Sequence, residues 1–318
     1  MTRAEERAGL AFAALCAANG AFVPAVAKLT TDRADALFVA AATTFFAGAT
    51  ALVVLAARCE LALLVHPRIG PRLLAVGALG TGAAFWFFFQ GARRATAIET
   101  VLCLQIEPAY ALAAAWVVLG ERPTARRLGA IALLLVGIAL ALGFGGAFAP
   151  AGVWLLLATP LCWQLSHLIV VRALRGVPPA VLTGARYAYG AVVLGLAWAL
   201  GGATIGLAPG GSLPALLPAL VVQGVVLSYV GTIMWYGAIA RLDLARTTAI
   251  VVPSIPLLSL VATFVLLGER PTLPQSVGVV LTAIGVLGFV TAPHAIATRA
   301  RVPTWTAPLA ALRARRRR

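Results

Sequence analysis

Charge is what this sequence has least of. Only 11% of its 318 residues are Asp, Glu, Lys or Arg, whereas about a quarter of the residues in a soluble protein are charged. Apolar residues make up 61% of the chain, and the mean hydropathy is +0.97. A soluble fold of this length buries too little surface to hide so many apolar side chains. The composition therefore predicts a protein whose main solvent is a lipid bilayer.

The groups that metal, redox and nucleotide chemistry need are also scarce. The three histidines are scattered, and the sole lysine, Lys28, belongs to no Gly-x-x-x-x-Gly-Lys phosphate loop. No Cys-x-x-Cys spacing occurs, and most of the cysteines lie in apolar runs, where cysteine packs as a small hydrophobe. They are Cys16, Cys59, Cys103 and Cys162. We therefore expect no metal, no cofactor, no catalytic residues and no enzyme, and we expect a gradient rather than ATP to supply energy.

Basic residues give a net charge of +15, but they occur in short segments between apolar runs. Nucleic-acid binding requires a basic face on a folded domain, and this distribution excludes one. The terminal run of Arg313 and Arg315 to Arg318 suits anionic lipid headgroups instead. The expected partners are the bilayer and a small-molecule substrate, with the protein a monomer or a homodimer.

Apolar stretches of about 20 residues, the length that crosses a bilayer, predict an all-α polytopic membrane protein with ten transmembrane helices. Most arginines outside them fall in connections on the same side as the N-terminus, so the positive-inside rule places both termini in the cytoplasm. We expect a bacterial-type plasma membrane. The predicted spans are 8–28, 36–57, 73–92, 95–119, 127–147, 152–171, 179–200, 214–239, 244–267 and 274–292.

A hexamer, Leu-Gly-Glu-Arg-Pro-Thr, occurs at 119–124 and again 148 residues later at 267–272. Such a self-match indicates a duplicated unit, and we divide the chain into a first repeat at 1–147, a second at 148–292 and a basic tail at 293–318. Each repeat holds five predicted spans. Because five is odd, the second repeat enters the membrane inverted, as in many secondary transporters.

Local rules give the repeated motif a structural interpretation. Glycine suits a helix C-terminus, Glu121 and Glu269 mark the headgroup layer, and the following proline can begin a helix. The fourth and ninth predicted spans contain Pro108 and Pro256, each of which removes a backbone hydrogen bond and is expected to bend its helix toward a central cavity.

Ionisable groups inside spans are costly and usually face a cavity or a partner. Glu107 lies near the middle of the fourth predicted span, and Arg186 lies within the seventh. We expect Glu107 to bind substrate or a coupling proton, with Arg186 as its partner. A protonated, packed Glu107 and an Arg186 that reaches the headgroups are the alternatives. Glu99, toward the outer end, either joins this site or pairs with an arginine nearby.

Further polar and aromatic residues in the spans are candidates to line the same cavity, although a single such residue is more often an interhelical hydrogen bond. Trp163, Gln164 and His167 fall at neighbouring positions of the sixth predicted helix. Asn19 lies in the middle of the first, and Tyr236 lies in the eighth.

Taken together, these residues resemble the EamA-type members of the drug/metabolite transporter superfamily over residues 8–292. The resemblance rests on the two Leu-Gly-Glu-Arg-Pro-Thr ends, on Glu107-Pro108, and on Trp235-Tyr236 with Ala240. Asn19-Gly20, Trp163 and Arg186 also match positions of similar character in that family. Two departures are a second helix with Phe45-Phe46 and no arginine, and Phe87-Phe88 where the second half has Trp235-Tyr236.

The resemblance implies a secondary transporter that works by alternating access. We expect export of a small metabolite, an amino acid or an amphipathic compound. An uptake carrier or an exchanger on the same fold is the alternative, and a non-transporting membrane protein or an intramembrane enzyme is less favoured because acid–base groups are so few.

Overall fold

The computed structural model describes residues 3–120, 122–143, 151–242 and 244–292. These residues form helices and no strand, and 10 helical segments are long and apolar enough to cross a membrane. The predicted all-α architecture of ten spans is thereby confirmed. Most spans are single helices: α1 (Arg3–Thr31), α2 (Ala36–Ala57), α7 (Ala125–Leu142), α8 (Ala151–Ala173), α9 (Pro179–Leu200), α12 (Leu244–Leu267) and α13 (Leu273–Thr291).

Three spans are assembled from shorter pieces. The fourth consists of α5 (Ala97–Leu104) and α6 (Glu107–Leu119), separated by a turn. The third consists of α3 (Gly70–Gly77), η2 (Ala78–Ala83) and α4 (Ala84–Arg94), and the eighth of α10 (Leu213–Val221), η3 (Val222–Val230) and α11 (Gly231–Leu242). A 3₁₀ turn, η1 (Leu61–Leu63), precedes the third span.

The segments η2 and η3 are π-helical, a rare geometry that is frequent at functional sites. Moved by the repeat offset of 148 residues, 78–83 falls on 226–231 and overlaps η3. The third span of the first repeat and the third span of the second repeat, which is the eighth of the chain, therefore each carry a π segment at an equivalent depth. We call these two spans the third spans.

The repeated hexamer is a helix end followed by a helix start. Gly120 and Gly268 cap α6 and α12 with φ of 73° and 69°, in the left-handed region that glycine adopts without strain. The hydroxyls of Thr124 and Thr272 then accept backbone N–H groups in the first turns of α7 and α13, as N-cap residues do. The glycine and threonine positions of the hexamer thus have the same local structure in both copies.

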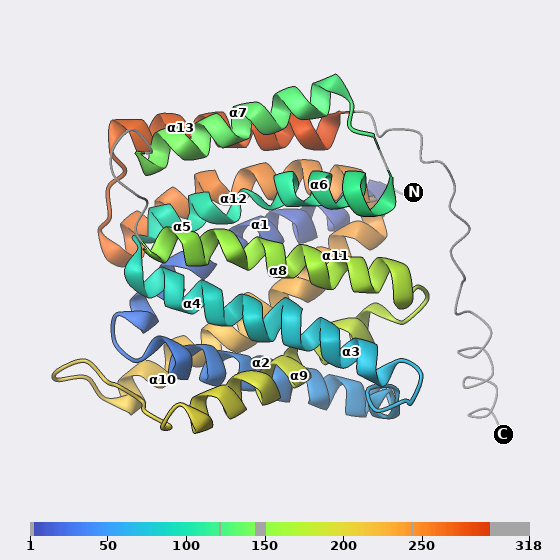
Figure 1. The fold of residues 1–318 in the computed structure, drawn as a ribbon, viewed down its shortest axis with the longest axis vertical. Helices are drawn as coiled ribbons and strands as arrows, with labels where there is room; N and C mark the ends of the chain where they lie inside the picture. The colour runs from blue at the N-terminus through green and yellow to red at the C-terminus, as the bar shows by residue number, and fades with distance from the viewer. Residues whose placement is uncertain (1–2, 121, 144–150, 243, 293–318) are drawn as a thin grey trace.

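Interhelical packing follows the duplication. Helices α7 and α13, the fifth spans, pack together at one edge of the bundle, and α2 and α9, the second spans, pack together at the opposite edge (Figure 1). Helix α1 packs on α11, and its counterpart α8 packs on α4. Helix α1 begins and α13 ends at the same end of the bundle, as an even number of crossings requires.

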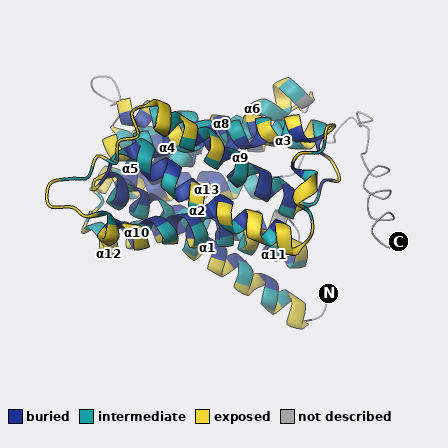
Figure 2. Ribbon diagram, turned by 90° about the horizontal axis from the view of Figure 1, so that it is seen from below, coloured by how far each residue is buried: buried dark blue, intermediate teal, exposed yellow. Residues whose placement is uncertain are grey.

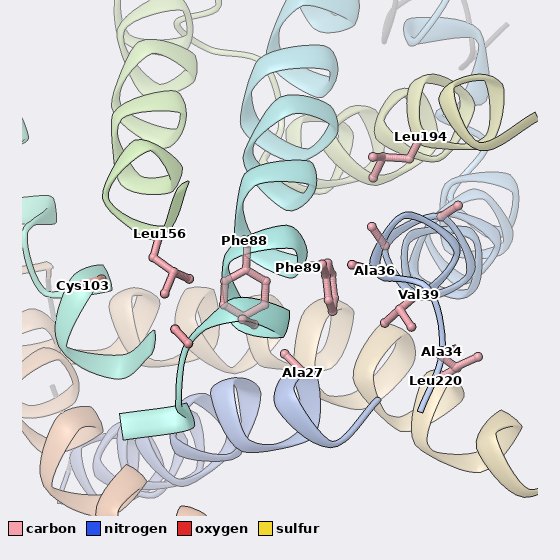
Figure 3. Close-up of a cluster of buried hydrophobic side chains, with 14 of the residues drawn as sticks. Ala27, Ala34, Ala36, Val39, Phe88, Phe89, Cys103, Leu156, Leu194 and Leu220 are labelled. Carbon is pink, nitrogen blue, oxygen red and sulfur yellow. The ribbon is translucent and has the colours of Figure 1, made fainter. Parts of the chain in front are cut away.

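The largest buried cluster lies where α2, α4, α8, α9 and α10 meet, and it includes Val39, Phe88, Phe89, Leu156 and Leu194 (Figure 3). Outward helix faces carry large apolar side chains that remain exposed (Figure 2). A helix in lipid needs no polar outer face, so this arrangement fits the composition.

Candidate functional site

Glu107 is the first residue of α6 and sits directly after the turn that interrupts the fourth span. Pro108 occupies the first turn of α6, where its missing N–H costs no helical hydrogen bond. The half-buried Glu107 carboxylate therefore projects near a helix N-terminus, which stabilises negative charge. By contrast, α12 continues as a single helix through the buried Pro256. The two symmetry-related prolines therefore occupy different local structures.

Glu107 is held by α8. The Gln164 amide donates from Nε2 to Oε1 of the Glu107 carboxylate at 2.9 Å. Both residues are partly buried, near the centres of their spans. A carboxylate at this depth needs such donors because lipid supplies none.

Arg186, on α9, approaches the same group. One terminal nitrogen of its guanidinium donates to the Gly80 carbonyl in η2 at 3.0 Å, and its Nε is buried without a partner. Its charge acts on both the Glu107 carboxylate and the His167 ring. Among the described residues, the ion pairs within 4.0 Å do not join Arg186 to Glu107. The Arg186 guanidinium and the Glu107 carboxylate are thus near enough to interact electrostatically, but they do not form an ion pair.

Helix α8 supplies the rest of this group. His167 lies one turn after Gln164 on the same helix, and its surface is exposed. Trp163 has a buried indole N–H with no hydrogen-bond partner. A buried unpaired donor is costly, so these donors of Trp163 and Arg186 are the ones in this group that require an explanation. We call Glu107, Trp163, Gln164, His167 and Arg186 the charged cluster.

Two predicted site residues do not join the charged cluster. Asn19, on α1, donates from Nδ2 to the Leu227 carbonyl in η3 at 3.0 Å. It is the repeat equivalent of His167, but it binds the π segment of the second half. Tyr236, on α11, is exposed by 37%, and no hydrogen bond or ion pair among the described residues links it to Glu107.

Glu269 has a specific partner that its sequence position did not reveal. Its carboxylate accepts the backbone N–H groups of Ala97, at 3.1 and 3.2 Å, and Ile98, at 3.4 Å. It therefore caps the N-terminus of α5 from the far end of the chain. Glu121, its repeat twin, lies outside the described residues. Glu99 completes a capping box with Thr96 at the same helix start, so it neither joins the charged cluster nor pairs with an arginine.

The two π segments are the feature that sequence reasoning missed. Side chains from other spans donate hydrogen bonds to carbonyls in or next to both π segments. Ser166 donates to Val76 O at 3.2 Å, next to η2, and Tyr187 donates to Ser228 O at 3.0 Å in η3. Glycine occurs in both segments, at Gly80 and Gly82 in η2 and at Gly224 in η3, but glycine alone does not predict a π geometry.

The described residues provide no metal centre. No group of three or more His, Cys, Asp or Glu among them is placed to hold a metal ion. A separate pocket at the loop end of the bundle is lined by Thr31, Asp32, Ala34, Arg93, Gly206, Leu207, Ala208 and Pro209. It shares no residue with the charged cluster.

Comparison with known proteins defines the class. The model of the EamA-like transporter family matches twice, over residues 7–143 and 150–291. The chain therefore belongs to the EamA-like transporter family, and it is a multi-pass membrane transporter.

One curated relative is the probable terminal-alkyne amino-acid exporter of Streptantibioticus cattleyicolor. It is 29% identical over 219 residues, which cover 68% of this chain and 72% of the relative. A solved crystal structure aligns with a TM-score of 0.62 at 20% identity, covering 91% of this chain and 97% of its own. At that identity the likeness concerns the fold alone.

Proposed function

We propose that the protein is a gradient-driven secondary exporter of small zwitterionic molecules of the amino-acid class. The observation that carries this proposal is the charged cluster, in which Glu107 and Arg186 lie close at membrane depth without forming an ion pair. A zwitterion presents an ammonium and a carboxylate. When a zwitterion lies between the two residues, its ammonium pairs with Glu107 and its carboxylate pairs with Arg186.

Each charged group of such a substrate has suitable partners. The ammonium pairs with the free oxygen of the Glu107 carboxylate, whose other oxygen already accepts from Gln164. The substrate carboxylate accepts from Arg186 and from the unpaired indole N–H of Trp163. Charge-assisted hydrogen bonds of this kind are the strong ones in a desolvated site. The name of the amino-acid exporter from S. cattleyicolor supports the same substrate class.

Alternating access between two inverted halves provides the mechanism. The duplicated sequence, the two family matches and the exchange-symmetric helix packing support a first unit at 1–147 and a second at 148–292. Symmetry makes opening to either side similar in cost. The arginine distribution supports cytoplasmic termini, with the tail at 293–318, in a bacterial inner membrane.

Glu107 also serves as the coupling group. A proton and the substrate ammonium compete for the same carboxylate, so each weakens the binding of the other by the same factor. A proton that enters from outside displaces the substrate at the outer face and is released inside when the next substrate binds. This competition converts a proton gradient into net export.

Vesicle transport of L-propargylglycine, a simple amino acid with a terminal alkyne, tests the function and its direction. Everted membrane vesicles that contain the protein should accumulate the compound when their interior is acidified, and vesicles without the protein should not. Accumulation only in right-side-out vesicles would establish the alternative of uptake. Equal signals with and without the protein would remove the amino-acid assignment.

A further inference from the structure

Helix α9 places two consecutive polar residues between the third spans of the two halves. Arg186 donates to the carbonyl of Gly80 in η2, at 3.0 Å, and Tyr187 donates to the carbonyl of Ser228 in η3, also at 3.0 Å. Residues 80 and 228 are separated by 148, the repeat offset. Adjacent side chains of one helix thus bind the same carbonyl of the duplicated unit in both halves.

The Tyr187 ring also contacts both third spans, through packing against aromatic side chains. It packs edge-on against Phe85, which follows η2, with ring centroids 6.5 Å apart, and against Tyr229 in η3 at 6.3 Å. Its hydroxyl also lies 3.3 Å from that of Thr232. The side chain is 95% buried, with 5% exposed. A buried ring in contact with both third spans cannot remain in place when only one of them moves.

The two carbonyls belong to the segments in which a helix can most readily change. A π segment differs from an α-helix by one residue of register, and such segments mark bends in long helices. Arg186 and Tyr187 each add a hydrogen bond to one carbonyl of these segments, Gly80 in η2 and Ser228 in η3. A change in the geometry of either segment moves that carbonyl and therefore acts on α9.

Only one of the two second spans supplies this bridge. Its counterpart α2 contains neither an arginine nor a tyrosine, and it packs instead with its backbone close to η3, where a Cβ on Gly224 would lie 2.3 Å from the Thr43 carbonyl. The bridge is therefore an asymmetric addition to a symmetric fold.

We propose that Arg186 and Tyr187 of α9 couple the two π segments mechanically, so that a change in η2 on one side of the site is transmitted to η3 on the other. Tyr187 is a positioning residue in this scheme. It sets the relative placement of the third spans during transport and does not hold the substrate. The proposal adds to the alternating access proposed above, but its structural readout requires no knowledge of the substrate.

Removal of the Tyr187 hydroxyl tests the coupling. Tyr187→Phe keeps both ring contacts and deletes the hydrogen bond to η3. Tyr189→Phe is the matched control, because Tyr189 lies on the same helix and donates an equivalent bond, at 2.8 Å, to the Leu64 carbonyl outside the π segments. Tyr187→Leu removes the ring contacts as well and completes a graded series.

Spin labels at positions 74 and 233, exposed sites on α3 and α11, report the distance between the third spans in nanodiscs by double electron–electron resonance. We expect the distance distribution to broaden in Tyr187→Phe, to broaden further in Tyr187→Leu, and to stay as in the wild type in Tyr189→Phe. Transport of L-propargylglycine should slow roughly two- to tenfold in Tyr187→Phe, the equivalent of one hydrogen bond, with its half-saturating concentration unchanged.

Distance distributions in which both Tyr187 variants match the control would overturn the coupling. So would a raised half-saturating concentration with an unchanged distribution, since that pattern would assign Tyr187 to substrate binding. A wild-type protein that does not transport L-propargylglycine would refute the amino-acid function, while the distance measurement would still decide the coupling.

Discussion

The contact between the fifth spans gives a sharp test of the packing. Gly137 of α7 faces α13, and a Cβ added there would lie 2.6 Å from the Thr282 hydroxyl oxygen, 2.7 Å from the Gly278 carbonyl oxygen and 2.7 Å from the Thr282 nitrogen. Two of these atoms are backbone and cannot rotate away. Gly137→Ala must therefore push the helices apart.

Gly129 is the matched position. It lies on the same helix, and a Cβ there meets nothing within 4 Å. Both substitutions gain about 1 kcal/mol of helix propensity, but only Gly137→Ala incurs the overpacking cost of about 1–3 kcal/mol. We expect Gly129→Ala to be neutral or stabilising, with Gly137→Ala less stable than Gly129→Ala by about 1–3 kcal/mol.

Equilibrium unfolding by SDS in mixed micelles, followed by circular dichroism, measures both free energies of unfolding under one condition. The comparison between variants cancels the shared propensity gain and isolates the close approach of α7 to α13. Equal stabilities for the two variants would show that these helices do not touch at Gly137.

Two further predictions concern the repeated hexamer. Single cysteines at Arg122 and Arg270, in a background without the native cysteines, should react with impermeant reagents from opposite sides of the membrane, and labelling of both from outside would exclude inverted halves. Glu269→Gln keeps an oxygen acceptor for Ala97 and Ile98 but removes its charge, and should lower the free energy of unfolding by about 1 kcal/mol. An unchanged unfolding free energy would show that the charge of this cap contributes nothing.

Features set by nearby sequence were predictable. The ten spans follow from runs of apolar residues, and the glycine caps at Gly120 and Gly268 follow from local rules. Pro123 and Pro271 were expected to begin helices, but they precede the N-cap residues Thr124 and Thr272. Glu107 stood out because a carboxylate within an apolar span requires a partner. Its hydrogen bond with Gln164 joins helices four and six, whereas Asn19 and Tyr236 of helices one and eight lie apart from it, and a shared substrate site remains a prediction.

Features set by distant segments were not predictable in this way. The carbonyls of η2 and η3 accept hydrogen bonds from Arg186, Tyr187 and Asn19, which lie more than 40 residues away in sequence. Glu269 appeared to be a headgroup-level charge, because nothing near it in sequence identifies the start of α5 as its partner. The interruption before Glu107 and the continuous α12 show that matching prolines do not impose matching backbones.

The central claim is that Glu107 binds substrate and couples its movement to protons. Glu107→Gln keeps the shape of the side chain and removes the charge, and Glu99→Gln, eight residues earlier in the same span but outside the charged cluster, is the matched control. The measurement is the rate of L-propargylglycine accumulation in acid-loaded everted vesicles at equal protein content.

Loss of a charge-assisted bond to the ammonium predicts a fall of about tenfold or more in Glu107→Gln, with no remaining dependence on the pH gradient, and a near wild-type rate in Glu99→Gln. Wild-type transport by Glu107→Gln, still driven by the pH gradient, would contradict the account and return this carboxylate to a packing role.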